Sequence, residues 1–408
     1  MMKENRGFPC ALVTRRKAVS LRGGHPWVYE DEIIRTEGAV ENGCLIDVRS
    51  EKGTYLGTGL WSEKSKIRIR VLDHNANETF SDAFFERRVR YAVQYRFDVM
   101  GEDVNACRLI HGEADGLPGL TVDRYEDILV SELLSYGIDQ RKQIIYQALL
   151  KELADRGTVI RGIYERNEAQ LREKEGLPLH KGWAEIGIEP PDVPLVEITE
   201  NGIRYEVDVE NGQKTGFFLD QKYNRRAAGK LAKGRTVLDC CTHTGSFALN
   251  AAKGGAAHVT AADISEFAIA QAKANAARNH FEEKMDFVCA DVFEFLQDLK
   301  MRPLRYDFII LDPPAFTKSR KTFANARSGY RRLNALAMKY LRRGDYLATA
   351  SCSHFMPERE FLALLGEAAG DAGVGIRFIE RRSAAMDHPV LASVPETDYL
   401  KFVLLQIV

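Results

Sequence analysis

The amino-acid sequence predicts an α/β fold, with a doubly wound sheet in the C-terminal half and two smaller units before it. Short apolar runs recur along residues 236–353 and are separated by segments of helical character. Short β-rich runs fill residues 1–74, and a proline-rich stretch at 190–194 is typical of a linker. These observations predict three domains, with the boundaries 1–74, 75–190 and 191–408.

The first unit has the pattern of a small β-barrel. Its runs GCLIDVRS, TYLGTGLW and KIRIRVL are separated by glycine and charged turns. In the second unit, residues 80–100 have the spacing of a linking helix, and strand-like and helical runs follow to about residue 190. Glu113 and Asp115 could be mistaken for a metal site, but the surrounding glycines and proline favour tight turns. The seven cysteines contain no CxxC pair, so we expect no metal and no disulfide framework.

Four carboxylates and one thiol lie at or just beyond the ends of predicted strands in the C-terminal unit. They are Asp239 in TVLDCC, Asp263 in VTAADIS, Asp291 in CADVFEF, Asp312 in FIILDPPAF and Cys352 in TASCSHF. The carboxyl ends of parallel strands share one edge of a sheet, and such folds bind nucleotide-like ligands there. We therefore expect these side chains to converge on one binding site.

The turn after the first of these strands contains Gly245, but no lysine follows it and no GxGxxG pattern is present. A ligand without phosphates therefore fits better. Asp263 suits the hydroxyls of a ribose, and Asp291 can accept a hydrogen bond from the amino group of adenine. Adenine and ribose without phosphates indicate S-adenosylmethionine. Each Asp taken alone has an equally good explanation as a solvated strand end, but four in order argue against coincidence.

Cys352 follows the apolar run YLATAS on the same predicted edge as Asp312. A cysteine after a strand is more often a small buried hydrophobic residue. Beside a methyl donor, however, a thiolate can attack carbon 6 of a pyrimidine and make carbon 5 nucleophilic. Asp312 would then stabilise the adduct by holding a proton at ring nitrogen 3. His243 and His354 lie near this chemistry and are each more often structural.

These motifs resemble the class I S-adenosylmethionine-dependent ribosomal RNA large-subunit methyltransferase I family, which makes 5-methylcytidine in bacterial 23S ribosomal RNA. The resemblance rests on GGHPWVYEDEI, RLIHGEADGLPGLTVDRY, NGQKTGFFLDQKYNR, DPPAF and SCS. It implies a Rossmann-like methyltransferase domain with an antiparallel C-terminal strand, a PUA-like RNA-binding barrel at 1–74, and Cys352 as nucleophile. A barrel that only supports the other units is the alternative.

The resemblance also implies a cofactor site, because the block at 211–225 closes over the methyl donor in this family. The expected cofactor-binding residues are Phe217, Asp220, Gln221, Arg225, Asp239, Thr244, Gly245, Asp263, Ile264, Asp291, Val292 and Asp312. Many RNA cytosine methyltransferases carry a second cysteine after Asp-Pro-Pro, whereas this chain has Ala315. A single thiol would therefore both attack and be released.

Residues 317–343 carry nine Lys or Arg and no Asp or Glu, although the whole chain has a net charge of −1. Such cations can hold the phosphates of an extruded strand, while the leucine spacing in the same stretch predicts a packed helix. We expect a helix over 330–343 and an RNA-contacting loop over 318–327. The predicted RNA-binding residues are Lys318, Arg320, Lys321 and Arg327.

The predicted function is cytosine-C5 methylation of large-subunit ribosomal RNA, with the target base flipped out of its stack to reach Cys352. One alternative is a guanine N-methyltransferase of the same fold in which Cys352 is structural. Another is a non-catalytic RNA-binding protein of ribosome assembly that holds S-adenosylmethionine as a stabilising ligand. No signal peptide and no run of 18 apolar residues is evident, so we expect a soluble cytoplasmic protein. The resemblance allows a homodimer.

Overall fold

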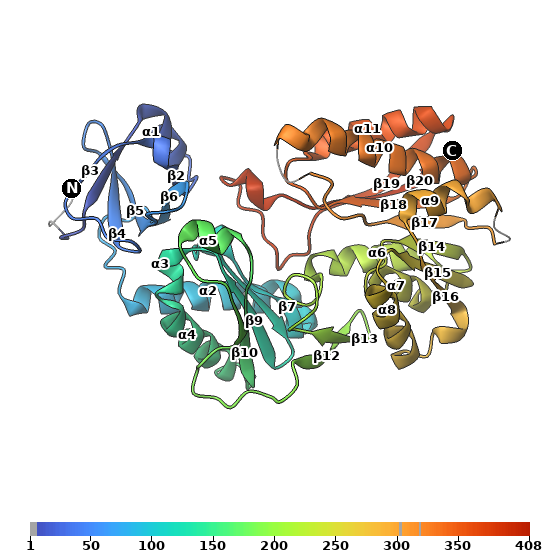
Figure 1. The fold of residues 1–408 in the computed structure, drawn as a ribbon, viewed down its shortest axis with the longest axis horizontal. Helices are drawn as coiled ribbons and strands as arrows, with labels where there is room; N and C mark the ends of the chain where they lie inside the picture. Colours follow the sequence, from blue (N-terminus) through green and yellow to red (C-terminus); the bar gives the residue numbers. More distant parts are fainter. Residues whose placement is uncertain (1–5, 302–303, 318–319) are drawn as a thin grey trace. The chain divides into compact units, whose positions relative to one another are not determined.

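The computed structural model describes residues 6–301, 304–317 and 320–408, which form two compact units (Figure 1). Each unit is assembled from three segments of the chain. Unit 1 contains Met1–Ile198, Val207–Leu219 and Met386–Thr397, and unit 2 contains Thr199–Glu206, Asp220–Ala385 and Asp398–Val408. The first two predicted domains thus fall in one unit, and the division into three domains stays a prediction.

The first part of unit 1 is a six-stranded sheet with the strand order β2-β6-β5-β4-β1-β3. Its elements are β1 (Cys10–Val13), α1 (Arg15–Arg22), β2 (Trp27–Tyr29), β3 (Ile33–Glu37), β4 (Leu45–Ser50), β5 (Tyr55–Trp61) and β6 (Ile67–Asp73). Val28, Ile46, Val48 and Ile69 are fully buried in its core. Gly59 is required where β5 meets β6, because a Cβ there would lie 2.4 Å from the carbonyl oxygen of Arg70.

The second part of unit 1 is a five-stranded sheet with the order β11-β10-β9-β8-β7. Its elements are α2 (Asp82–Met100), β7 (Ala106–His111), β8 (Leu120–Tyr125), β9 (Ile128–Leu133), α3 (Tyr136–Asp139), α4 (Lys142–Ala154), β10 (Gly162–Asn167), α5 (Leu171–Glu175) and β11 (His180–Trp183). Glu113 and Asp115 lie in a short 3-10 turn, where Glu113 accepts from the Trp27 indole at 2.9 Å and Asp115 pairs with Arg96 at 2.6 Å. These contacts agree with their predicted role in a turn.

The segment Met386–Thr397 belongs to unit 1 although it follows most of unit 2 in the sequence. The backbone amide of Arg108 donates to the Asp387 carboxylate at 2.8 Å, and the Arg96 guanidinium donates to the Asp387 carbonyl at 2.9 Å. The buried His388 ring lies 5.3 Å from that of His111. A late part of the chain therefore completes the polar core of unit 1.

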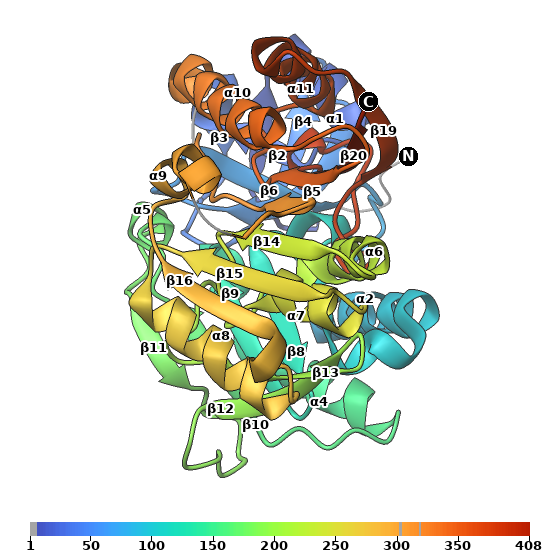
Figure 2. The same cartoon turned by 90° about the vertical axis from the view of Figure 1, so that its right-hand side faces the viewer.

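Unit 2 is built on a seven-stranded sheet with the order β16-β15-β14-β17-β18-β20-β19 (Figure 2). The strands are β14 (Thr236–Cys240), β15 (His258–Asp263), β16 (Met285–Cys289), β17 (Phe308–Leu311), β18 (Tyr346–Ser351), β19 (Ile376–Arg382) and β20 (Lys401–Ile407). Strands β14 to β18 pair in parallel, whereas β20 runs antiparallel to both of its neighbours. The doubly wound sheet and its antiparallel last strand are confirmed.

Helices cover both faces of this sheet (Figure 1). They are α6 (Lys222–Leu231), α7 (Ser246–Lys253), α8 (Glu266–Arg278), α9 (Val292–Gln297), α10 (Phe323–Tyr340) and α11 (Glu358–Ala372). The core on one face packs residues of α9, α10 and α11 against the strands, with Leu238, Ile309 and Leu347 fully buried there. A hairpin of β12 (Leu195–Glu200) and β13 (Ile203–Asp208) precedes α6. In the part of the chain that the structure describes, no helix has the length and apolar character needed to cross a membrane.

Candidate active site

The four strand-end carboxylates of unit 2 converge as the strand pattern predicts. Cys240 pairs with Ala262 on one side and with Leu311 on the other, so Asp263 and Asp312 follow at the same level of the sheet. All four carboxylates also lie close enough to the Cys241 thiol to shift its pKa. Burial raises the pKa of Cys241, and Asp263, Asp312, Asp239 and Asp291 raise it further.

The turn between β14 and α7 has an unusual backbone. Cys241 and His243 adopt positive φ angles of 61° and 50°, and Gly245 follows at 81°. Two non-glycine residues in the left-handed region cost free energy, so other contacts must hold them in place. The amide of Thr242 donates to Ala262 at 3.0 Å, and the amide of His243 donates to Asp263 at 2.9 Å. Asp263 thus fixes the turn that leads into α7.

Asp239 is a fully buried carboxylate beneath this turn. Its Oδ2 accepts hydrogen bonds from the Thr242 hydroxyl at 2.6 Å and from the Ala248 amide at 2.9 Å. Its Oδ1 has no hydrogen-bond partner among the described residues, and neither has the buried Thr244 hydroxyl. Burial raises the pKa of Asp239 to about 7. A buried acceptor of this kind suits a cationic ligand group.

The next two strand ends provide acceptors beside an exposed apolar side chain. The Asp263 carboxylate also accepts from the Ser265 amide at 3.0 Å. Asp291 caps α9 by accepting from the amides of Phe293 and Glu294. Ile264 leaves 70% of its surface exposed between these carboxylates, and Val292 is half-buried.

This arrangement fits S-adenosylmethionine. Asp239 Oδ1 can accept from the cationic amino group of the methionine part, Asp263 can accept from the ribose hydroxyls, and Ile264 offers an apolar surface to the adenine ring. The individual contacts stay predictions. Among the described residues, no group of three or more His, Cys, Asp and Glu side chains is arranged to hold a metal ion.

The start of α6 holds Asp312 in place through side-chain amides. Gln221 donates from Nε2 to Asp312 Oδ1 at 3.1 Å and accepts from Asn224 at 2.6 Å. Asn224 in turn donates to the Ser383 carbonyl at 3.1 Å and accepts from Arg382 at 3.0 Å. Asn224 was missed in the sequence analysis, although it lies inside the conspicuous 211–225 block.

Other residues of that block have mainly structural contacts. Asp220 accepts from the Tyr399 hydroxyl at 2.6 Å, and its carbonyl accepts from the Ala385 amide at 2.8 Å. Arg225 is buried and forms a bidentate ion pair with Glu200, with both distances 2.7 Å. Phe217 belongs to unit 1, where its amide donates to the Tyr125 hydroxyl at 3.1 Å. Their predicted contacts with the cofactor stay predictions.

Cys352 lies just beyond β18 and is half-buried. Its sulfur is 3.9 Å from the carbonyl oxygen of Pro313, the residue after Asp312. Burial raises the pKa of Tyr330 to about 12, and Cys352 and Asp312 both lie near enough to raise it further. The Cys352 thiol therefore lies beside Pro313, and both it and the Asp312 carboxylate lie near Tyr330 at the same edge of the sheet.

Lys401 is a second group at this edge, and it too was missed in the sequence analysis. It is the first residue of β20, is almost completely buried, and pairs with Ser351 of β18. Its Nζ donates to the carbonyls of Ser353 at 2.8 Å and Tyr399 at 3.0 Å. Burial lowers the pKa of Lys401 to about 8. Burial also lowers the pKa of His243, to about 4, so this imidazole is neutral near pH 7.

The basic stretch differs from its prediction, because α10 begins at Phe323 and not near residue 330. The predicted loop over 318–327 is therefore wrong for its last five residues. Arg327 lies in the helix and forms a bidentate ion pair with Glu367. Lys321 is exposed, Lys318 lies outside the described residues, and only the backbone of Arg320 is described.

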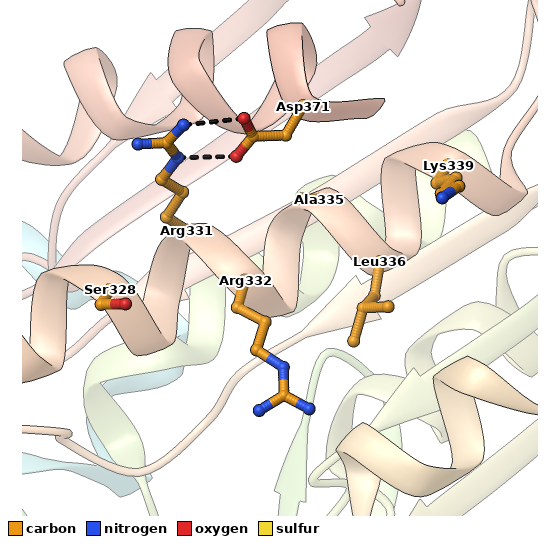
Figure 3. Close-up of a pocket in the computed structure, with 7 residues that line it drawn as sticks. All are labelled: Ser328, Arg331, Arg332, Ala335, Leu336, Lys339 and Asp371. Atoms are coloured by element: carbon orange, nitrogen blue, oxygen red, sulfur yellow. Dashed lines mark hydrogen bonds and ion pairs between the residues drawn. The ribbon is translucent and has the colours of Figure 1, made fainter. Parts of the chain in front are cut away.

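The exposed face of α10 borders a groove of about 360 Å³ (Figure 3). It is lined by Ser328, Arg331, Arg332, Ala335, Leu336, Lys339 and Asp371. Arg331 turns toward Asp371 and pairs with it at 2.6 Å, whereas Arg332 points the other way. Within the described part of the chain, Arg332 and Lys339 form no ion pair, and Arg332 instead lies 5.2 Å from the Phe293 ring. The groove is therefore cationic.

Comparison with known proteins agrees with this geometry. Residues 186–405 match the family of S-adenosylmethionine-dependent methyltransferases, and residues 12–74 match the PUA-like domain. The chain is 40% identical to ribosomal RNA large subunit methyltransferase I of Aliivibrio fischeri (strain MJ11) over 385 residues, which covers 94% of this chain and 95% of that protein. The protein of the same name from Serratia proteamaculans is also 40% identical and covers 96% of this chain and 97% of its own length.

Two solved structures share the fold. A protein from Streptococcus mutans, assigned as a SAM-dependent methyltransferase, superposes with a TM-score of 0.81 at 22% identity and covers 97% of this chain and 99% of its own. Another chain, assigned as a methyltransferase and complexed with SAH, has a TM-score of 0.82 at 21% identity with the same coverage. The identity and coverage of the curated relatives show that this chain belongs to the ribosomal RNA large subunit methyltransferase I family of S-adenosylmethionine-dependent methyltransferases.

Proposed function

We propose that this enzyme methylates carbon 5 of a cytidine in 23S ribosomal RNA through a covalent adduct between Cys352 and carbon 6 of the base. The observation that carries the proposal is the meeting of Cys352 and Asp312 at the edge that also bears the cofactor carboxylates. Ribosomal RNA as substrate is supported by the names of relatives that align along almost the whole chain.

When bound, S-adenosylmethionine supplies a methyl group on a sulfonium, which is electrophilic. Asp239, Thr244 and Gly245 would hold the methionine end at the turn before α7. Asp263, Ile264, Asp291 and Val292 would hold the nucleoside. Asp220, Gln221, Arg225 and Phe217 are the further proposed cofactor residues, of which Gln221 is the best supported because it bonds Asp312.

In the proposed reaction the Cys352 thiolate forms a bond to carbon 6, and the electron pair of the carbon 5–carbon 6 double bond becomes available at carbon 5. Asp312 holds a proton at ring nitrogen 3 and so stabilises the adduct. Carbon 5 would form a bond to the methyl group as the bond between that group and the sulfonium sulfur breaks, which leaves S-adenosylhomocysteine. Carbon 5 would then lose its proton to a base. The electron pair left behind re-forms the double bond and expels the Cys352 thiolate.

RNA would be held by the PUA-like barrel and by the basic residues around α10. Lys318, Arg320, Lys321 and Arg327 are the predicted contacts, although the ion pair of Arg327 with Glu367 already satisfies part of its charge. Arg332 and Lys339, which line the groove beside α10, form no ion pair among the described residues. We therefore add them to the proposed RNA contacts. A homodimer stays a prediction.

The test is transfer of a labelled methyl group from S-adenosylmethionine to ribosomal RNA that lacks this modification, with the product base identified by mass. The wild type should give 5-methylcytidine, Cys352→Ala should give none, and Cys10→Ala, which removes a half-buried thiol in unit 1, should be as active as the wild type. Methylated guanine, or activity that survives Cys352→Ala, would favour the guanine N-methyltransferase. No transfer by a folded, cofactor-binding wild type would favour a non-catalytic assembly protein.

A further inference from the structure

Lys401 is a buried amine for which the proposed reaction has no role. Only 4% of its surface is exposed, and its Nζ donates to the carbonyls of Ser353 and Tyr399. In the part of the chain that the structure describes, no carboxylate lies within ion-pair distance of it. Burial is costly for a lysine that no carboxylate contacts directly, so such a residue is rarely kept for packing alone.

Lys401 contacts both chain neighbours of Cys352. Its backbone pairs with Ser351, the residue before Cys352, and its Nζ bonds the carbonyl of Ser353, the residue after it. An ammonium group has three N–H bonds, and two of them point to the carbonyls of Ser353 and Tyr399. The third remains for a further acceptor. Against the larger lowering by burial, Asp398, Cys352 and Glu358 all lie near enough to Lys401 to raise its pKa.

We propose that the Lys401 ammonium, held beside Cys352 by two backbone carbonyls, stabilises the thiolate form of Cys352. The thiol proton leaves to a solvent base, and the negative sulfur is balanced by the buried cation. Lys401 is thus a positioning residue for the nucleophile. The use of the thiolate for cytosine methylation rests on the proposed function, but the ionisation of the thiol does not.

The other titratable groups near Cys352 determine the pH range in which Lys401 can stabilise the thiolate. The Asp312 carboxylate opposes a thiolate, and the Tyr330 phenol is neutral because its pKa is about 12. Because the pKa of Lys401 is lowered to about 8, its charge is present below that pH and is lost above it. Support for the thiolate is therefore strongest near neutral pH. A proton held at nitrogen 3 by Asp312 would reduce the electrostatic repulsion between this carboxylate and the thiolate during the reaction.

The experiment measures the rate at which iodoacetamide alkylates Cys352 between pH 5.5 and 10, resolved by peptide mass spectrometry on the full-length protein without RNA. The wild type should show a midpoint below the ordinary value for a thiol, about 8.5. Lys401→Met should raise the midpoint by about one unit or more and slow alkylation at pH 7 about tenfold, since one unit changes the thiolate fraction tenfold. Lys401→Arg should keep the low midpoint. The exposed Cys289 in the same digest monitors the reagent.

A wild-type midpoint at or above 8.5 would overturn the proposal without any variant, which matters if Lys401→Met does not fold. An unchanged midpoint in folded Lys401→Met, checked by its melting temperature and cofactor binding, would also overturn it. The readout is independent of methyl transfer. A low, Lys401-dependent midpoint in an enzyme that makes no 5-methylcytidine would refute the proposed function and leave the role of Lys401 intact.

Discussion

The side-chain amide of Gln221 donates a hydrogen bond to the carboxylate of Asp312, with 3.1 Å between the nitrogen and the oxygen. The same amide accepts from Asn224, so the orientation of the Asp312 carboxylate depends on a chain of side chains at the start of α6. In the proposed reaction this carboxylate must meet ring nitrogen 3 of the base. Small errors in its orientation should therefore slow the reaction.

Gln221→Leu should lower kcat for RNA methylation about tenfold to a hundredfold, because it removes the donor that orients Asp312. Steady-state kinetics with labelled S-adenosylmethionine would measure this loss. Gln143→Leu is a matched control, since Gln143 is exposed in unit 1 and, among the described residues, its side chain bonds only the Glu185 carbonyl. Equal kcat values for wild type and Gln221→Leu would show that Asp312 needs no such support.

Cofactor binding should strengthen as the pH rises through about 7. Burial raises the pKa of Asp239 to about 7, and only its ionised form attracts the cationic amino group of the ligand. Titration calorimetry in two buffers of different ionisation enthalpy should detect a proton released on binding near pH 6. Asp239→Asn should bind at least about tenfold more weakly at pH 8 and lose this pH dependence. Asp291→Asn should weaken binding but retain this pH dependence.

The same carboxylate makes the protein without ligand less stable at high pH. Its pKa is higher in the folded state than the ordinary value of 3.8, so the folded state binds the proton more tightly than the unfolded chain does. The free energy of unfolding should therefore fall as the pH rises from about 4 to about 7. In Asp239→Asn this contribution should disappear, and denaturant unfolding at pH 5 and pH 8 would show whether the difference shrinks.

The buried Arg225–Glu200 pair should matter for stability. Glu200→Gln removes the carboxylate of the bidentate pair with the buried Arg225 guanidinium, and the loss of one member of a buried pair costs about 3–5 kcal/mol of unfolding free energy. Glu380→Gln, which removes the exposed partner of Arg382, should cost less than about 1 kcal/mol. Chemical denaturation would compare the two. A cost below 1 kcal/mol for Glu200→Gln would mean that Arg225 finds another partner.

RNA affinity should depend on Arg332 and Lys339 in a salt-sensitive way. Each phosphate contact that is lost lowers the slope of log affinity against log salt by about 0.7–0.9. Arg332→Gln combined with Lys339→Gln should therefore reduce the slope by roughly 1.5. Arg161→Gln, in unit 1 outside the PUA-like domain and paired with Asp127 at 2.6 Å, is the control. A slope equal to that of the wild type would remove the α10 groove from the RNA interface.

The strand-end carboxylates could be predicted from the sequence because parallel strands place their carboxyl ends together whatever the helices do. Lys401 could not, because it contacts the neighbours of Cys352, Ser351 and Ser353, from an antiparallel strand whose register depends on the closed sheet. The ion pair of Arg225 could not be predicted either, because its partner Glu200 lies in a separate hairpin. Both cases have one origin: the sequence does not say which buried charges pair with each other.

The start of α10 was mispredicted for a local reason. The leucine spacing that predicted the helix lies after residue 330, and the dense cations before it favoured a loop. In the structure Gly329 lies inside the helix, where a Cβ would come within 3.0 Å of the Phe316 ring. The glycine therefore makes room for an aromatic ring and does not end the helix. Packing partners distant in sequence decide such cases.

The three-segment construction of unit 1 has a consequence for the order in which the protein is made. Its polar core includes Asp387, which bonds Arg96 and Arg108 across sequence separations of 291 and 279 residues. A ribosome must synthesise nearly all of unit 2 before unit 1 has every residue it needs. The N-terminal half is therefore first to emerge and among the last to be finished, and a nascent chain stopped before residue 386 should stay sensitive to proteases along its earliest part.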